Sequence, residues 1–357
     1  MIMAELPFDV ITSQILSRLP AKSVVRCKCV CKQWLYFLST QEFARMHCRN
    51  MTTAHNHKLL TIDRRRSCSI QTIDYESLDH ASTKIIRSVP FKVRRPSDVL
   101  VLASLDGLVC ACLSNTSELV IWNPLTGACN KLSNSKSQGF YKPYSDAVGF
   151  YKDGSSNDYR IMHIKQRRRS DIRVYIYSQR SDSWRKIRFL KKHRCASYHY
   201  LWSSGTFSGD SLYFTVYTYW MAETVIIGFD VNSEKFKEIR FPGVKANERC
   251  RGHLVNVENC IHLFATYGFH SREYDLWRME GEKWLKVAVI PGVENIMTSW
   301  PATYVVSKDR WLVLWHYKAD VYEIDMKTKD YICVYPGNML KTLQRAIYIE
   351  TLVSPSL

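Results

Sequence analysis

The chain has 357 residues, of which 46% are hydrophobic, and it carries a formal net charge of +17. That hydrophobic content is ordinary for a globular protein, and no apolar run approaches the roughly 18 residues that a membrane helix needs. The twelve cysteines are scattered, and Glu5 and Asp9 interrupt the N-terminus before any signal-peptide core. We therefore expect reduced thiols, a location in the nucleus or the cytoplasm, and no membrane partner.

The first 45 residues predict three short amphipathic helices. Pro7 suits the first turn of a helix, which Pro20 ends, and four apolar residues between the two prolines share one helical face: Ile11, Ile15, Leu16 and Leu19. From Cys27 to Leu38, apolar residues again recur at helical spacing, which predicts a stripe nearly three turns long. A bundle this small buries little surface on its own, so we expect its apolar side to bind a partner protein.

The rest of the chain repeats a unit of about fifty residues. Similar segments lie 47 to 55 residues apart around five anchor residues: Asn123, Ser178, Asp230, Arg278 and Asp325. An apolar strand pattern precedes each anchor, and a polar turn and a second strand follow it. Another turn stands earlier in each copy, so each repeat supplies two hairpins and four strands. Four strands in about fifty residues are typical of one blade of a β-propeller.

A weaker sixth repeat spans residues 58–89, and the apolar strand over residues 347–353 is free to pair into this first blade. We therefore predict a mainly β fold with a small all-α N-terminal module. The helical domain covers residues 1–48, and a β-propeller of about six blades covers residues 49–357. A two-layer β-sandwich is the rival architecture, but the near-constant period argues against it.

The N-terminal segment resembles the F-box motif, especially its plant form, over roughly residues 4–45. The matching pattern reads Leu-Pro, Val-Ile, Ile-Leu-x-Arg-Leu-Pro-x-Lys-Ser-Val and Val-Cys-Lys-x-Trp. This resemblance implies binding to a Skp-family adaptor, which would link the chain to the cullin and RING subunits of a ubiquitin ligase. It also implies an adaptor-binding set of twelve residues: Leu6, Pro7, Ile11, Ile15, Leu16, Leu19, Pro20, Val24, Val25, Val30, Cys31 and Trp34. The alternative is an ordinary helical cap on the β domain.

Segments that begin at Gly107, Val174 and Ile226 resemble the plant F-box-associated, kelch-like domain, and this similarity extends over most of residues 95–353. Together the two resemblances imply an F-box three-helix module followed by a kelch-like propeller. In such a protein the helices would hold the adaptor and the propeller would hold a target protein for ubiquitination.

The connectors between repeats should all emerge on one face of a propeller. They combine lysine and arginine with large aromatic residues, a composition typical of protein-recognition surfaces. We predict that this face captures a target protein through an acidic or phosphorylated segment. The alternative is that the connectors are merely solvated. The predicted substrate-binding residues are Arg94, Arg95, Tyr144, Lys191, Lys192, Arg194, Tyr198, Tyr200, Trp202, Arg249, Arg251 and Trp300.

Other classes of function find little support in the sequence. The chain has no phosphate-binding loop, no His-Glu-x-x-His and no Gly-x-Ser-x-Gly. On a helix, Cys27, Cys29 and Cys31 could not converge on one metal ion, so we expect no metal and no cofactor. The basic runs 64–66 and 165–169 lack any nucleic-acid reading motif, so we expect no specific nucleic-acid partner.

We interpret the chain as a non-catalytic substrate receptor of an SCF-type cullin ubiquitin ligase. Two alternatives remain open. One is an F-box and propeller interaction protein that acts outside a ligase. The other is a basic scaffold associated with nucleic acid, which the net charge of +17 would favour.

Overall fold

The computed structural model divides the chain into two compact units. Met1–Leu132 and Gln344–Leu357 form the first unit, and Ser133–Leu343 form the second. The structure describes residues 6–51, 57–63, 70–73, 83–86, 89–91, 98–113, 116, 118–132, 146–168, 171–189, 200–218, 224–244, 250–268, 273–291, 301–305, 310–315, 321–325, 327–328, 330–335 and 342–355. The domain boundary predicted after residue 48 stays a prediction, since the helices belong to the same unit as the first two sheets.

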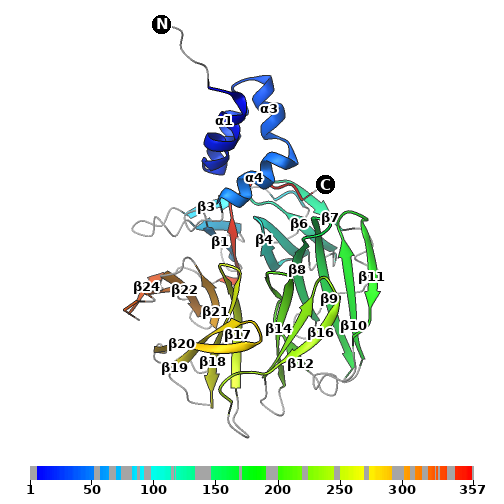
Figure 1. Ribbon diagram of the computed structural model, residues 1–357, viewed down its shortest axis with the longest axis vertical. Helices are drawn as coiled ribbons and strands as arrows, with labels where there is room; N and C mark the ends of the chain where they lie inside the picture. The colour runs from blue at the N-terminus through cyan, green and yellow to red at the C-terminus, as the bar shows by residue number, and fades with distance from the viewer. Residues whose placement is uncertain are drawn as a thin grey trace. The chain divides into compact units, whose positions relative to one another are not determined.

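The first unit begins with a helical module, drawn in blue in Figure 1. Pro7 and Pro20 each precede a helical segment, with the fixed backbone that suits this position. No described helix is long and apolar enough to cross a membrane. The segments are α1 (Phe8–Val10), the π-helical turn η1 (Ile11–Ile15), the 3₁₀ turn η2 (Leu16–Arg18), α2 (Ala21–Cys27), α3 (Lys32–Leu38) and α4 (Gln41–Met51).

The apolar stripe predicted from Cys27 to Leu38 is not one continuous helix. The helix α2 ends at Cys27, and Cys31 has an extended backbone with φ of −157°. The Sγ atom of Cys31 accepts a hydrogen bond from the backbone N–H of Trp34, which caps the start of α3. This break rotates the residues of α3 away from the face that a continuous helix would give them.

The core of the helical module draws on its helical segments from η1 to α4 and on the C-terminal segment. Leu16, Val24, Leu38 and Phe43 are buried in one cluster, and Leu352 belongs to the same cluster. Aromatic rings add edge-on contacts, with 5.6 Å between the ring centroids of Phe37 and Phe43. The helical module is therefore packed together with the C-terminal segment of its own unit.

Two four-stranded sheets complete the first unit. The strand β25 joins the first sheet beside β1, as expected, but it spans residues 342–349 rather than the expected 347–353. Tyr348 of that strand packs with Leu60 and Trp122 in a core that both sheets share. In order, the sheets are β25 (Thr342–Ile349), β1 (His57–Asp63), β2 (Ile70–Ile73) and β3 (Thr83–Ile86), and then β4 (Val99–Leu105), β5 (Leu108–Leu113), β6 (Glu118–Trp122) and β7 (Cys129–Lys131).

Four antiparallel sheets form the second unit, largely green to orange in Figure 1. They are β8 (Asp146–Asp153), β9 (Asp158–Arg168), β10 (Asp171–Ser178) and β11 (Ser183–Ile187); β12 (Tyr200–Trp202), β13 (Thr206–Ser208), β14 (Ser211–Thr218), β15 (Thr224–Asp230) and β16 (Lys235–Ile239); β17 (Cys250–Val257), β18 (Cys260–Tyr267), β19 (Glu273–Glu280) and β20 (Lys283–Pro291); and β21 (Pro301–Val305), β22 (Arg310–Trp315), β23 (Val321–Asp325) and β24 (Tyr331–Tyr335). The described strands thus form six sheets, which confirms the predicted fold class.

The turns predicted from the repeat pattern have the backbone conformations that tight hairpins require. Asp106 and Gly107 have φ values of 51° and 79°, and Glu258 and Asn259 have φ values of 48° and 60°. These left-handed conformations match the twist of the strands that each turn joins. At the anchor Asp230, the side-chain Oδ1 accepts the backbone N–H of Ser233 and so closes the second turn of its repeat.

An ion-pair network ties two neighbouring sheets of the second unit. Arg160 on β9 places its guanidinium 2.7 Å from Asp153 and 3.2 Å from Asp158, and 3.9 Å from Glu234 at the β15–β16 turn. Burial opposes the ionisation of Asp153, but hydrogen bonds from Ser155 and Ser156 and the charge of Arg160 outweigh it and lower its pKa to about 2. Asp153 therefore stays charged, and the ion pairs of Arg160 join the two sheets.

Candidate functional site

The helical module leaves an unusual share of large hydrophobic side chains in contact with solvent. Ten such residues stand out among those that the structure describes, and six of them belong to this short module. Their exposed fractions run from 42% to 79%. We call these six the exposed apolar residues of the module: Leu6, Ile15, Val25, Val30, Leu35 and Tyr36.

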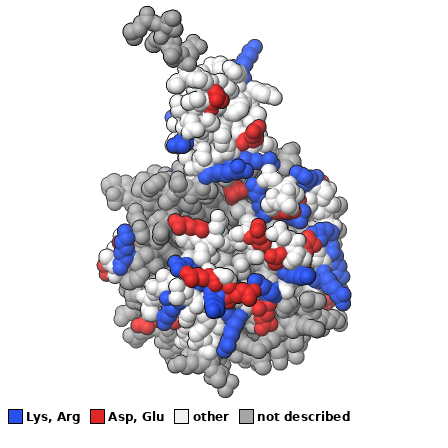
Figure 2. Space-filling model, in the orientation of Figure 1, with Lys and Arg blue, Asp and Glu red and all other residues white. Residues whose placement is uncertain are grey.

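Figure 2 agrees with this composition, because the module's surface in that view is mostly free of charged side chains. Leu35 and Tyr36 also line a shallow depression of about 420 Å³ together with Lys32, Ser39 and Thr40. Exposed apolar side chains beside a depression are typical of a protein-binding surface. The module therefore has an apolar surface that its own fold leaves uncovered.

Two adjacent aliphatic residues at the π-helical turn η1 differ sharply in exposure. The backbone N–H of Leu16 bonds to the carbonyls of both Ile11 and Thr12, which widens the turn by one residue. Ile15 is 44% exposed, whereas Leu16 is 3% exposed. The turn thus presents one side chain to solvent and gives the next to the core.

The twelve residues of the predicted adaptor-binding set fall into three groups. Leu16 and Val24 are buried in the core, where they support the surface without forming it. Ile11, Leu19 and Trp34 are partly buried against that core. The remaining seven are exposed and are available for contact: Leu6, Pro7, Ile15, Pro20, Val25, Val30 and Cys31.

Sequence reasoning missed two exposed residues, Leu35 and Tyr36. The apolar stripe expected from Cys27 to Leu38 included Leu35, but neither Leu35 nor Tyr36 was placed in the adaptor-binding set. The break at Lys28–Cys31 changes the phase of α3, so that Leu38 is buried while Leu35 and Tyr36 are exposed. The sequence carries little signal for this break, because cysteine is not among the residues that usually cap the start of a helix.

The described residues of the module include few side chains that could act in catalysis or bind a metal. His47 is fully buried, and its Nε2 lies 2.8 Å from the carbonyl oxygen of Leu19. Burial lowers the pKa of His47, so the imidazole is neutral and donates this hydrogen bond. Cys29 and Cys31 are exposed thiols. Across the described part of the chain, no three acidic, cysteine or histidine residues come together as metal ligands.

The predicted substrate-binding set falls mostly outside the described residues. Of its members, Tyr200 and Trp202 lie in β12, and Arg251 lies in β17. The other nine lie in segments that the structure does not describe: Arg94, Arg95, Tyr144, Lys191, Lys192, Arg194, Tyr198, Arg249 and Trp300. The predicted capture face therefore stays a prediction.

Trp202 and Arg251 have well-defined neighbours within the second unit. The ring of Trp202 contacts Phe189 and Phe214, with centroid separations of 6.2 and 6.0 Å, so it contributes to the packing of its sheet. Arg251 is exposed, and its guanidinium lies 5.1 Å from the ring centroid of Tyr217. An arginine placed over an aromatic ring is a common element of recognition surfaces.

Positive and negative side chains alternate over the described strands of the second unit, as Figure 2 shows for the face in view. Several of these positive charges are paired: Arg185 with Glu234, Lys237 with Glu282, Arg278 with Glu280 and Lys286 with Asp275. Paired charges contribute less to a continuous basic field, which is the feature that a nucleic-acid scaffold would need.

Comparisons with known proteins agree with this geometry. Residues 3–45 match the F-box domain family, and residues 49–318 match the family described as the F-box associated beta propeller domain. The F-box protein CPR1 of Arabidopsis thaliana is 25% identical over 348 residues, which cover 87% of this chain and 79% of that protein. An F-box/kelch-repeat protein of the same plant is also 25% identical, over 98% of this chain and 96% of its own length.

Among solved structures, a chain from the crystal structure of a nidogen/laminin complex aligns with a TM-score of 0.52. The alignment covers 82% of this chain and 99% of that chain, at 10% sequence identity. At this level the similarity concerns the fold alone.

Proposed function

This chain belongs to the family of plant F-box proteins with a C-terminal F-box-associated β-propeller domain, and on that premise we propose that it is the substrate-recognition subunit of an SCF-type ubiquitin ligase. Its helical module docks to a Skp-family adaptor and, through that adaptor, to cullin and RING subunits. Its β domain captures the target protein. The protein acts in the nucleus or the cytoplasm.

The exposed apolar residues of the module carry this proposal. Six large hydrophobic side chains in contact with water are unfavourable for an isolated protein, and covering them on association is favourable at roughly 25 cal/mol per Å² of apolar surface. The F-box match over residues 3–45 covers all six. A protein partner of the adaptor class is therefore the occupant that fits both the composition and the family.

The mechanism needs no catalytic group on this chain. A receptor that holds adaptor and target at once raises the effective concentration of target lysines near the conjugating enzyme. The chemistry of ubiquitin transfer then belongs to the other subunits. For the target, we propose an acidic or phosphorylated segment, since the connectors between the repeats are rich in arginine and lysine.

The test is a binding measurement between the full chain and a purified plant Skp-family adaptor. In the variant Val30→Asp with Leu35→Asp, two carboxylates would have to be buried at the interface, so we expect an affinity at least ten-fold weaker. The matched control is Ile332→Asp, which changes an equally exposed aliphatic side chain on β24 in the other unit. Equal affinity for the intact chain, the variant and the control would contradict the proposal.

A further inference from the structure

The C-terminal segment, residues 350–355, is buried in the first unit although it forms no regular secondary structure. Thr351, Leu352 and Val353 are 0%, 8% and 1% exposed. Leu352 enters the same apolar cluster as Leu16 and Phe43 of the helical module. A segment without regular secondary structure usually lies exposed at the surface. Here such a segment is a component of the core.

Two contacts lock this segment to the second sheet. The side-chain amide of Asn123 is fully buried, and its Nδ2 donates to the carbonyl oxygens of Thr351 and Val353 at 2.9 and 2.8 Å. The hydroxyl of Thr351 donates to the carbonyl of Asp106 at 2.8 Å. At the adjoining Gly107, a Cβ atom would collide with Thr351 and with the carbonyl of Ile349. The backbone of β4–β7 is thus shaped to receive the segment.

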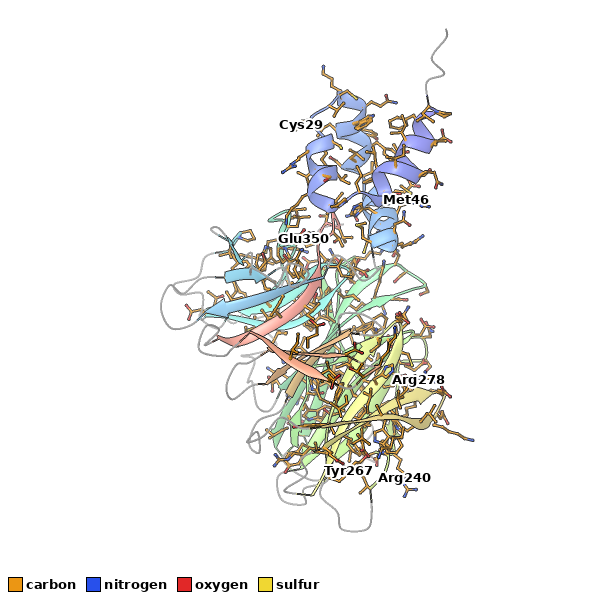
Figure 3. All side chains as sticks on the ribbon, turned by 90° about the vertical axis from the view of Figure 1, so that its left-hand side faces the viewer. Cys29, Met46, Arg240, Tyr267, Arg278 and Glu350 are labelled. Atoms are coloured by element: carbon orange, nitrogen blue, oxygen red, sulfur yellow. The ribbon has the colours of Figure 1, made fainter. Side chains whose placement is uncertain are left out.

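A third contact reaches from the segment to the helices. Lys22 of α2 lies 2.9 Å from Glu350, whose side chain is only 13% exposed. Figure 3 shows Glu350 at the base of the helical module, at the opposite end from Cys29. Leu125, at the turn between β6 and β7, packs against the same cluster as Leu352. The segment therefore lies between the module and the sheet and contacts both.

We propose that the C-terminal segment is a structural part of the adaptor-binding module, which takes its binding-competent form only when this segment is inserted. The helices are synthesised more than 300 residues before Leu352, so the module remains incomplete until Leu352 has been made. Without Leu352, a cavity opens among Leu16, Val24, Leu38 and Phe43. Adaptor recruitment thereby becomes conditional on a chain that extends through this segment.

The test compares the intact chain with two shortened chains, by amide hydrogen exchange and by adaptor binding. One chain ends after Ile349, and its control ends after Pro355 and so keeps the whole segment. We expect the amides of α2–α4 to exchange at least ten-fold faster in the shorter chain, with unchanged exchange in the control. Adaptor affinity should fall at least ten-fold in parallel, and a synthetic peptide of residues 350–357, which the shorter chain lacks, should restore it.

A point variant separates this effect from general unfolding. Leu352→Ala keeps every backbone contact of the segment, so faster exchange in α2–α4 with unchanged exchange in β8–β20 supports the proposal. Unchanged exchange in the helices, or an equal rise in both regions, overturns it. The binding readout rests on the proposed function, but the exchange readout does not. An intact chain that fails to bind the adaptor would therefore contradict the proposed function and leave the exchange result decisive for this inference.

Discussion

His47 of α4 donates a hydrogen bond to the backbone carbonyl of Leu19, with 2.8 Å between Nε2 and oxygen. Leu19 is the last residue before Pro20, at the point where the chain turns from η2 into α2. The bond thus joins α4 to the corner between η2 and α2. Burial lowers the pKa of His47, while this hydrogen bond opposes the shift.

This geometry predicts that acid loosens the helical module. A histidine of the unfolded chain titrates near 6.5, whereas folded His47 binds its proton only at lower pH, so stability is lost as pH falls below about 6.5. Protonation would also place a second N–H on the buried Nδ1, which has no acceptor among the described residues. Protection of the α4 amides, taken relative to the intrinsic exchange rate at each pH, should therefore fall between pH 6.5 and 5. The variant His47→Gln keeps a donor but does not titrate, and its protection should not fall in this way.

The π-helical turn predicts opposite effects for two neighbouring residues. Leu16→Ala empties a core position and should lower the free energy of unfolding by about 3 kcal/mol. Ile15→Ala should change stability by less than about 0.5 kcal/mol, because that side chain is exposed, yet it should weaken adaptor binding several-fold. Denaturant titrations and binding isotherms on the same two proteins test both statements. The same loss of stability in both variants would contradict the assignment of faces.

The ion-pair network of the second unit predicts a stability effect that leaves adaptor binding unchanged. Arg160→Met keeps much of the side-chain volume but leaves the buried carboxylates of Asp153 and Asp158 without their cation. Removing one partner of such a pair costs about 3 kcal/mol. The free energy of unfolding measured in urea should fall by that order, while adaptor affinity stays the same. Lys152→Met on the neighbouring strand β8 is a control of similar chemistry.

The predicted capture face remains open to a direct experiment. Substituting Lys191, Lys192 and Arg194 together by Glu should abolish recovery of the target protein, since an acidic or phosphorylated segment would then meet like charges. Adaptor binding should be unchanged in this variant. Recovery of the target in unchanged amounts would show that the target binds elsewhere. As a control, replacing Lys235 and Lys237 on β16 by Glu measures the effect of charge alone.

The repeat pattern was sufficient to predict the β domain, because each repeat carries its own turn chemistry. The turn at Asp106 and Gly107 and the Asx turn at Asp230 are local features, so their positions follow from a few adjacent residues. The pairing of the C-terminal strand with the first sheet also followed from the count of strands. Local signals repeated at a constant period give redundant evidence for the same fold.

The faces of the helices could not be predicted as well, because they depend on the phase of each turn. One extra residue in the turn before Leu16, and the break at Cys31, each rotate the side chains that follow. The role of Leu352 was beyond local reasoning altogether, since it lies more than 300 residues from its neighbours Leu16 and Phe43. Contacts across such distances leave no periodic trace in the sequence.

Asn123 is protected from deamidation by the residue that follows it, Pro124. Its side chain donates to two carbonyls and accepts the N–H of Leu125, so conversion to aspartate would set a negative charge against carbonyl oxygens. Spontaneous deamidation proceeds through attack of the following backbone nitrogen on the side-chain amide. That nitrogen belongs to Pro124 and bears no hydrogen, so the cyclic imide cannot form readily. The hydrogen bonds from Asn123 to Thr351 and Val353 are therefore protected from loss by deamidation.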